Sequence, residues 1–340
     1  MNKADIGDFH RDALVIDSHN DTIVAHIRRR LGLSGNPNDR KRVEGTVAYL
    51  RERIPSQEVQ IDFAKMRTGG VDAAFFAVDV TRAWKHHLTY ALDAFGFFDA
   101  EVEAQGGDVV IARSAADIEA AKEASQLAAV LVIENSDGVE GSLHVLRMLY
   151  RLGVRSIGLT HDPRSDAADG NGEAGSKSGL TRFGVALVKE MNRLGMLVDV
   201  SHISEPGFWD VMEVTEKPVI ASHACCKALC DHSRNLSDEQ LKALAENGGV
   251  MGVTFVPRFV DQEQPTLARL LDHIDHGVQL VGPDHLGIGS DFDGGGLLAQ
   301  DTGVFLEIAE GLFERGYSEA DVEGILGGNH LRVLRDALGG

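Results

Sequence analysis

Seven acidic and imidazole side chains lie at or just past the ends of short apolar runs, where they could bind a divalent cation or move a proton. They are His19, Asp21, Glu134, His161, His202, His223 and Asp291. Continuous Val, Ile and Leu runs that end in turn residues are typical of strands buried in a parallel sheet. Because each polar residue falls at the same end of its run, the pattern predicts one shared mouth where the chemistry gathers.

Five of these residues form a candidate ligand set for metal ions. His19 and Asp21 are two positions apart, so an extended chain would point both side chains to one side. Glu134, His202 and His223 end three other predicted strands. Imidazole and carboxylate groups without thiolate suit zinc and related divalent ions. Alone, Glu134 would be interpreted as a charged residue at a solvated strand end.

Five ligands are more than one catalytic zinc ion normally takes beside its open position. Two ions that share a bridging carboxylate use the set better, and Glu134 is the candidate bridge. Ions about 3.5 to 4 Å apart can hold a water molecule between them and lower its pKa toward neutrality. The set therefore predicts a hydrolase in which a metal-bridging hydroxide attacks the substrate.

Three further residues could act on the substrate. His161 could bind metal or donate a hydrogen bond to a carbonyl oxygen as charge develops there, and we favour the second role. Asp291 could accept a proton from the bridging water and pass it to the leaving amine, although a turn-capping carboxylate is the alternative. Arg234 could hold a substrate carboxylate with two parallel hydrogen bonds, or form a surface salt bridge.

The elements that must position these residues alternate between strand and helix. Segments with helical spacing separate the strands, and Ser237-Asp238-Glu239-Gln240 has the form of a capping box. The strand-like runs are 13–17, 71–80, 129–133, 154–159, 196–200, 218–221, 249–255 and 286–289. Eight such units predict an α/β protein, a closed (β/α)8 TIM barrel of the metal-dependent hydrolase type. A doubly wound open sheet is the alternative, but it would draw its ligands from fewer strands.

The chain length permits this architecture. Such a barrel takes roughly 250 residues and tolerates insertions, and this chain has 340 residues, 43% of them hydrophobic. We interpret residues 1–340 as one barrel domain with two insertions, a long loop at 32–60 and a loop on the active-site face at 162–179. Long loops at this end often form lids, substrate contacts or subunit contacts.

The net charge and the distribution of apolar residues argue against several classes of partner. A net charge of -19 repels a polyanion, so nucleic acid is not an expected partner. The first residues lack the apolar stretch of an export signal, and no run is long enough to span a membrane, so we expect a cytoplasmic protein without a membrane partner. Cys225, Cys226 and Cys230 fit no zinc template and are expected to be reduced thiols.

Several motifs occur in the order found in one known family. They are Asp17-Ser18-His19-Asn20-Asp21, Leu159-Thr160-His161, Val198-Asp199-Val200-Ser201-His202, Ile220-Ala221-Ser222-His223, Ser233-Arg234-Asn235-Leu236-Ser237-Asp238, Ser290-Asp291-Phe292-Asp293-Gly294 and Gly328-Asn329-His330-Leu331-Arg332-Val333. From about Val15 to Leu334 the chain resembles the membrane (renal) dipeptidase family, the zinc peptidases of family M19 within the metal-dependent amidohydrolase superfamily.

The resemblance implies a role for each candidate residue. Two zinc ions per subunit would be held by His19 and Asp21 on one side, by His202 and His223 on the other, and by Glu134 between them. His161 and Arg234 would contact the dipeptide substrate, and Asp291 would manage the proton. The resemblance also implies a homodimer and hydrolysis of dipeptides, including those with a D-residue on the carboxyl side.

Two other functions remain open at this point. The barrel and its metals could act on another amide, a lactone or an aminopurine. A binding protein that keeps the site but has no turnover is the third hypothesis. Asp291 argues against it, because a pure binder has no need of a proton carrier.

Overall fold

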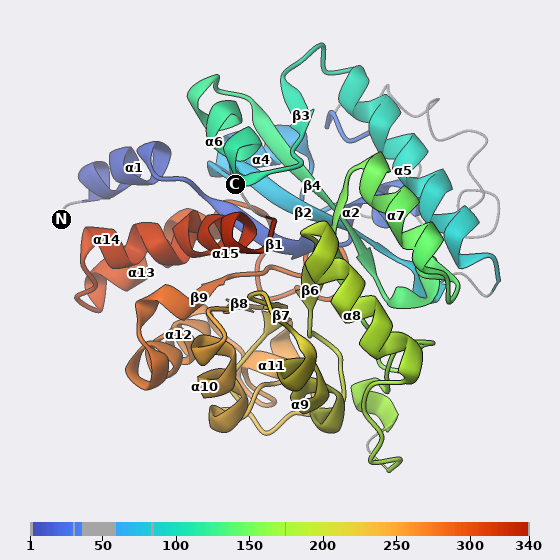
Figure 1. Ribbon diagram of the computed structural model, residues 1–340. Helices are drawn as coiled ribbons and strands as arrows, with labels where there is room; N and C mark the ends of the chain where they lie inside the picture. The colour runs from blue at the N-terminus through green and yellow to red at the C-terminus, as the bar shows by residue number, and fades with distance from the viewer. Residues whose placement is uncertain (1–2, 30, 36–58, 83–84, 174, 339–340) are drawn as a thin grey trace.

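The computed structural model describes residues 3–29, 31–35, 59–82, 85–173 and 175–338 (Figure 1). Nine strands form one sheet in which every pairing is parallel. Their bounds are β1 Ile16–Asn20, β2 Ala73–Asp79, β3 Val109–Ile111, β4 Leu127–Glu134, β5 Val154–Gly158, β6 Leu197–Asp199, β7 Ile220–Ala224, β8 Val250–Val253 and β9 Leu286–Ile288.

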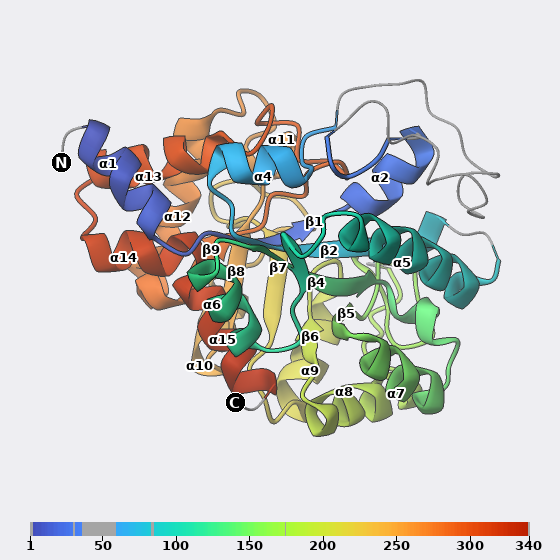
Figure 2. The ribbon, with the colours of Figure 1, turned by 90° about the horizontal axis from the view of Figure 1, so that it is seen from above.

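The α-helices surround these strands in both views of the ribbon (Figure 2). Their bounds are α1 Lys3–Asp12, α2 Thr22–Arg29, α4 Phe63–Gly69, α5 His87–Glu103, α6 Ala115–Glu123, α7 Leu143–Leu152, α8 Arg182–Leu194, α9 Glu205–Val214, α10 Asp238–Glu246, α11 Pro257–Val260, α12 Leu267–Val281, α13 Val304–Glu314, α14 Glu319–Glu323 and α15 Asn329–Leu338. Parallel strands require such crossover connections, because a short hairpin turn cannot join them.

The sheet closes into a barrel through the pairing of β2 with β4. The strand order is β2-β1-β9-β8-β7-β6-β5-β4-β3, and β2 also pairs with β4 from Ala73↔Ala128 to Asp79↔Glu134. Eight strands therefore form the closed ring, while β3 pairs with the start of β4 beside it. The predicted (β/α)8 barrel is confirmed, and the open doubly wound sheet is wrong.

Each of the eight expected strand runs overlaps a strand of the closed ring. The structure adds β3, which sequence reasoning missed. It has only three residues, and Val109 is the one residue of β3 that is fully buried. A strand this short shows no alternation that would separate it from a loop.

Alternate residues of the strands face opposite sides of the barrel wall. Phe75 of β2 packs in one buried cluster with residues of five other strands, whereas its neighbour Phe76 belongs to the cluster that includes the outer helices. The inner cluster also contains Leu334 of α15 and Ile118 of α6. These two helices close the amino end of the barrel, so the opposite end is the one open for a site.

Helix starts follow local capping chemistry. At α10, the Ser237 hydroxyl accepts from the Gln240 backbone N–H and the Gln240 side chain accepts from the Ser237 N–H, which confirms the predicted capping box. Ser318 and Asp321 form the same arrangement at α14. These caps satisfy amide groups that a helix start would otherwise leave without partners.

The two long insertions differ in how much of them the structure describes. Residues 36–58 of the predicted loop at 32–60 lie outside the described residues. The segment 162–179 is described except for residue 174, and isolated bridges join Ala168 to Leu180 and Gly170 to Ile203. The second bridge holds this segment against the end of β6, where predicted ligands lie.

The three cysteines are buried free thiols, as predicted. The Cys226 Sγ lies 3.4 Å from the His273 carbonyl oxygen, and the Cys230 Sγ lies 3.4 Å from that of Arg258. These two thiols thus have backbone partners, and burial raises the pKa of Cys226 to about 12.

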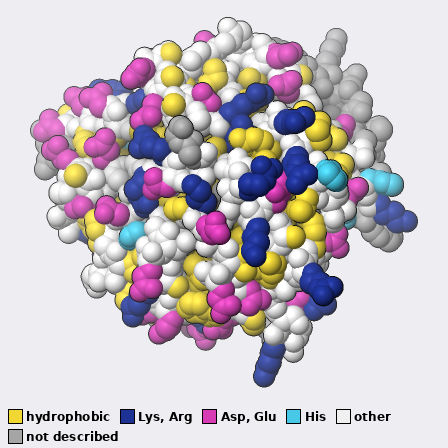
Figure 3. All heavy atoms as spheres, viewed as in Figure 1, with side chains coloured by type: hydrophobic (Ala, Val, Ile, Leu, Met, Phe, Trp, Pro, Cys, Tyr) yellow, Lys and Arg dark blue, Asp and Glu magenta, His cyan; other side chains and the backbone are white. Residues whose placement is uncertain are grey.

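Acidic and basic side chains share the face shown in Figure 3. Some basic side chains of the protein belong to local ion pairs: Arg335 of α15 lies 2.8 Å from Glu119 of α6, and Lys122 lies 2.9 Å from Asp72. Across the described ranges, no helix combines the length and hydropathy that crossing a bilayer would need.

His330 is buried in α15, where its Nε2 lies 3.1 Å from the Ile288 carbonyl oxygen. Burial lowers the pKa of His330 to about 4. The unfolded chain, with a histidine pKa near 6.5, therefore binds more protons between pH 6.5 and 4, and stability falls as the pH falls. His330 contributes roughly 3 kcal/mol to that loss.

The His330→Gln variant keeps an amide donor for the Ile288 carbonyl but has no titrating ring. We expect its unfolding free energy to vary less than that of the wild type between pH 7 and 4. Urea denaturation at several pH values measures this, with the exposed His144→Gln as the control. Parallel pH profiles for wild type and His330→Gln would contradict the assignment.

Candidate metal centre

The structure brings the five predicted ligands together at the carboxyl end of the barrel. Glu134 is the last residue of β4, and its Oε1 is the common neighbour of three imidazoles. The Glu134 Oε1 lies 3.1 Å from the His202 Nε2, 3.6 Å from the His223 Nε2 and 3.8 Å from the His19 Nε2. The His19 Nε2 in turn lies 3.9 Å from the Asp21 Oδ2. Glu134 therefore occupies the central position expected of a bridge.

Irregular strand register positions two of the histidines. Across Ser18 and His19, β1 gains one residue relative to β2, and across Ser222 and His223, β7 gains one relative to β8. Such bulges change the direction in which side chains point. The expected approach of His19 to Asp21 is found, but alternation along a continuing strand does not explain it, because β1 ends at Asn20.

Burial keeps the imidazoles in the form that binds cations. It lowers the pKa of His19 and His223 well below the ordinary value and that of His202 to about 4. Burial raises the pKa of Glu134 to about 7, with the nearby charge of Asp79 adding to the effect. A neutral imidazole presents the lone pair that a metal ion needs.

The buried polar atoms of these residues fit divalent ions, independently of the resemblance to a known family. Both ring nitrogens of His19 are buried and lack a hydrogen-bond partner within the described part of the chain. At His202, the Nδ1 lies 2.9 Å from the Asp162 Oδ1, so the ring donates there and its Nε2 lone pair faces Glu134. Buried polar atoms without partners are costly, and a cation would satisfy them.

Sequence reasoning missed three carboxylates beside the cluster. Asp79 ends β2 in register with Glu134, and Asp162 holds His202 from the loop after β5. Asp199 ends β6 and lies close to His19 and His223. Each of these residues also ends or follows an apolar run, so the signal used for the seven candidates would have found them.

His161 and Arg234 both lie near His202. The half-buried His161 ring stacks on that of His202, with centroids 4.1 Å apart, and burial lowers the pKa of His161. Arg234 is 5% exposed, so the surface salt bridge is wrong. Its Nη2 donates to the His223 carbonyl oxygen at 3.2 Å, while its buried Nε has no hydrogen-bond partner in the described ranges.

Asp291 follows β9 with a left-handed backbone, φ 56°. Its N–H donates to the His19 carbonyl oxygen at 2.9 Å, and its carboxylate, with His19 and Asp21, belongs to a group whose ligand atoms lie within 4.8 Å of one another. A side chain at Gly294 would collide with the carboxylates of Asp21 and Asp291. Glycine at this position thus lets the turn pass close over both acids.

Two cavities meet at this cluster. The smaller, about 150 Å³, is lined by Glu134, His161 and Asp291, among others. The larger, about 400 Å³, is lined by Arg234 and Trp209. His202 lines both, so a ligand in either cavity would lie beside the candidate ligand cluster.

A closed (β/α)8 barrel with imidazole and carboxylate groups gathered at the carboxyl ends of its strands defines the class of metal-dependent barrel hydrolases. Within that class, the sequence pattern of the membrane dipeptidase family, peptidase family M19, matches residues 3–338. The chain belongs to this family.

Similar proteins agree with this assignment. Dipeptidase verJ of Clonostachys rogersoniana is 39% identical over 228 residues, which cover 66% of this chain and 59% of that protein. Dipeptidase aclJ of Aspergillus oryzae is 36% identical over 294 residues, 82% of this chain and 70% of that protein. A metallopeptidase from Rhodobacter sphaeroides, solved with a phosphinate mimic of L-Ala-D-Ala, is 25% identical with a TM-score of 0.83, covering 96% of this chain and 99% of its own.

Proposed function

We propose that this chain is a dipeptidase with two zinc ions that hydrolyses the peptide bond of L,L and L,D dipeptides. The observation that carries the proposal is the convergence of His19, His202 and His223 on one oxygen of Glu134. The dipeptidases to which the chain is similar, and the L-Ala-D-Ala mimic bound to the Rhodobacter metallopeptidase, support the substrate class.

The ligand set divides into two halves around Glu134. His19 and Asp21 would hold one ion, His202 and His223 the other, and Glu134 would contact both. When bound, such a pair of ions supplies a strong nucleophile at neutral pH and stabilises negative charge on the attacked carbonyl group.

The remaining polar residues act on the substrate itself. His161, kept neutral by burial, donates a ring N–H to the carbonyl oxygen of the scissile bond. Asp291 accepts a proton as the nucleophile attacks and returns it to the leaving amine. Both residues line the smaller cavity with Glu134, so they face the same reacting group.

Arg234 limits the substrate to a peptide whose second residue ends the chain. Its guanidinium is buried, and a free carboxylate would fit its unpartnered Nε. A charged pair of this kind is strong when water is excluded. A longer peptide carries an amide in place of that carboxylate, which gives the guanidinium no matching charge.

Arg234→Ala separates this proposal from a hydrolase of neutral amides or lactones. For a dipeptide with a free carboxylate, we expect kcat/KM to fall by about 30- to 5000-fold, because truncating one partner of a buried charge pair costs about 2 to 5 kcal/mol. The same dipeptide as its C-terminal amide is the control, and its slower turnover should hardly change. Equal losses for both substrates would contradict the anchor.

The experiment that tests the proposed function is turnover on a panel. Purified, zinc-loaded protein is incubated with L,L and L,D dipeptides of varied side chains, and release of amino acids is measured. We expect cleavage of members of the panel and much slower cleavage of the matching tripeptides. Failure to cleave any dipeptide would reject the proposal.

A further inference from the structure

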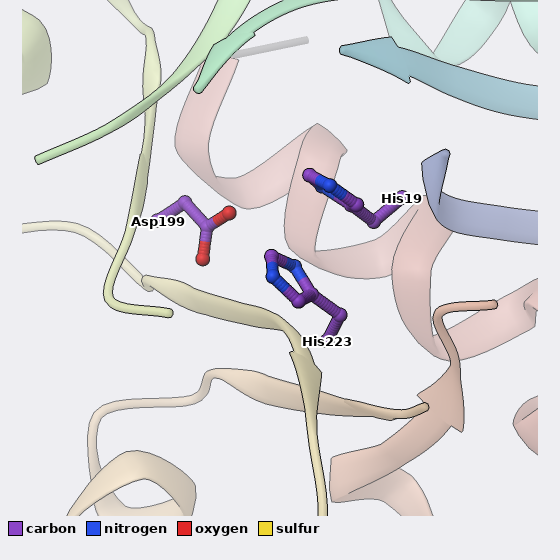
Figure 4. A group of neighbouring side chains, drawn as sticks. All are labelled: His19, Asp199 and His223. Atoms are coloured by element: carbon purple, nitrogen blue, oxygen red, sulfur yellow. The ribbon is translucent and has the colours of Figure 1, made fainter. Parts of the chain in front are cut away.

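Asp199 lies beside the cluster of candidate metal ligands, but both of its oxygens already accept hydrogen bonds. Figure 4 shows its carboxylate facing the rings of His19 and His223. Its Oδ1 accepts from the Ser201 N–H at 2.9 Å and the Ser222 N–H at 3.1 Å, and its Oδ2 accepts from the Ser222 hydroxyl at 2.5 Å. A carboxylate held by three donors is suited to orient its neighbours rather than to bind the ion.

The Ser222 hydroxyl transmits this orientation to His223. A hydroxyl has one proton, and here that proton points to Asp199, since a carboxylate only accepts. The Ser222 Oγ also lies 2.8 Å from the His223 Nδ1, so in that contact the oxygen must accept and the Nδ1 must carry the hydrogen. Ser201 completes the arrangement, with its Oγ 3.3 Å from that of Ser222.

The hydrogen on the His223 Nδ1 determines what the other ring nitrogen, Nε2, presents to the ligand cluster. With hydrogen on Nδ1, a neutral His223 presents a lone pair at Nε2, which lies 3.6 Å from the Glu134 Oε1 and 2.9 Å from the His202 Nε2. Asp162 enforces the same tautomer on His202. Neither ring then places a hydrogen between the two lone pairs and the Glu134 oxygen, which favours a cation.

We propose that Asp199 and Ser222 are positioning residues that fix the tautomer of His223 and so set the metal affinity of the half-site formed with His202. The inference deepens the proposed function, because it concerns the same cluster. It depends on metal binding and not on which substrate is cleaved.

Asp199→Asn is the most informative variant. It preserves the shape of the side chain and reverses the direction of the hydrogen bonds that run from residue 199 through Ser222 to His223. The two backbone N–H groups at Oδ1 require the amide oxygen there, which turns the NH₂ group toward Ser222. The Ser222 hydroxyl must then accept from Asn and donate to the His223 Nδ1. The ring hydrogen moves to Nε2, where it blocks the metal.

Metal affinity is the first measurement. Zinc binding by competition with a chromophoric chelator should be about 10- to 100-fold weaker for one of the two ions in Asp199→Asn and in Ser222→Ala. Ser156→Ala is the matched control, since this buried barrel serine donates only to the Leu197 carbonyl and should bind like the wild type. If Asp199 were itself a metal ligand, Ser222→Ala would keep full zinc affinity. That result would overturn the proposed positioning role.

The tautomer of His223 is the second measurement, and its deciding part uses the wild type alone. Nitrogen-15 NMR of the metal-free wild type, labelled in histidine, should show hydrogen on the Nδ1 of His223, and Asp199→Asn should show it on Nε2. Hydrogen on Nε2 in the wild type would overturn the proposal. Neither measurement uses a dipeptide, so a failed dipeptide panel would leave this inference standing, and the reverse also holds.

Discussion

Glu134→Gln is expected to lose at least one of the two proposed zinc ions and to lower kcat/KM by about 10³-fold or more. The variant keeps the size of the side chain but removes the negative charge on which His19, His202 and His223 converge. A bound pair of ions supplies several kcal/mol of transition-state stabilisation, and each 1.36 kcal/mol corresponds to about a tenfold change in rate. Metal analysis and steady-state kinetics on the same preparation measure both effects.

Glu190→Gln is the matched control for that prediction. Glu190 is also a largely buried glutamate, but it pairs with Arg147 and Arg193 away from the barrel mouth. This control should keep both ions and wild-type kinetics. If Glu134→Gln retained two ions and most of its activity, Glu134 would not be the bridge.

Asp291→Asn should separate catalysis from metal binding. We expect the variant to keep both ions while kcat falls by about 10² to 10⁴-fold, the usual contribution of a general base or acid. KM should change little, because the amide occupies the same place in the turn after β9 and Arg234 still binds the carboxylate. The measurements are zinc content and steady-state kinetics with a dipeptide that the wild type cleaves.

Two results would contradict the role of Asp291. Unchanged kcat would mean that another group carries the proton, and Asp79, which ends β2 in register with Glu134, would be the next residue to replace. Loss of a zinc ion would mean that Asp291 is a metal ligand, since its carboxylate is grouped with His19 and Asp21.

The barrel could be predicted because parallel strands leave a plain pattern. Buried strands such as β4 are apolar up to a polar last residue, here Glu134, and the eight strands of the ring match the eight runs. The pattern could not reveal β3, which is too short to show a period. It also could not reveal that the closing contact is β2 with β4, because β3 intervenes between them in the sequence.

The cluster could be predicted in membership but not in geometry. Polar residues at the ends of several strands had to meet if the sheet closed, and the five expected ligands do so. The bulges at His19 and His223 depend on hydrogen bonds between strands, which the sequence does not display. The supporting roles of Asp162 and Asp199 depend on hydrogen bonds to His202 and Ser222, which the sequence does not display either.

Several expectations about the whole protein and its surroundings stay predictions. They are the homodimer, the cytoplasmic location, the absence of membrane and nucleic-acid partners, and the treatment of residues 1–340 as one domain. The roles of the site residues stand as proposals that the variants above test.

Zinc titration of the metal-free protein, with dipeptide turnover followed in parallel, tests the central claim most directly. We propose that one buried cluster around Glu134 binds two ions that work together. We predict that binding saturates at two ions per chain and that turnover appears as the second ion binds. Full turnover by protein stripped of metal, or saturation at one ion with full activity, would contradict it.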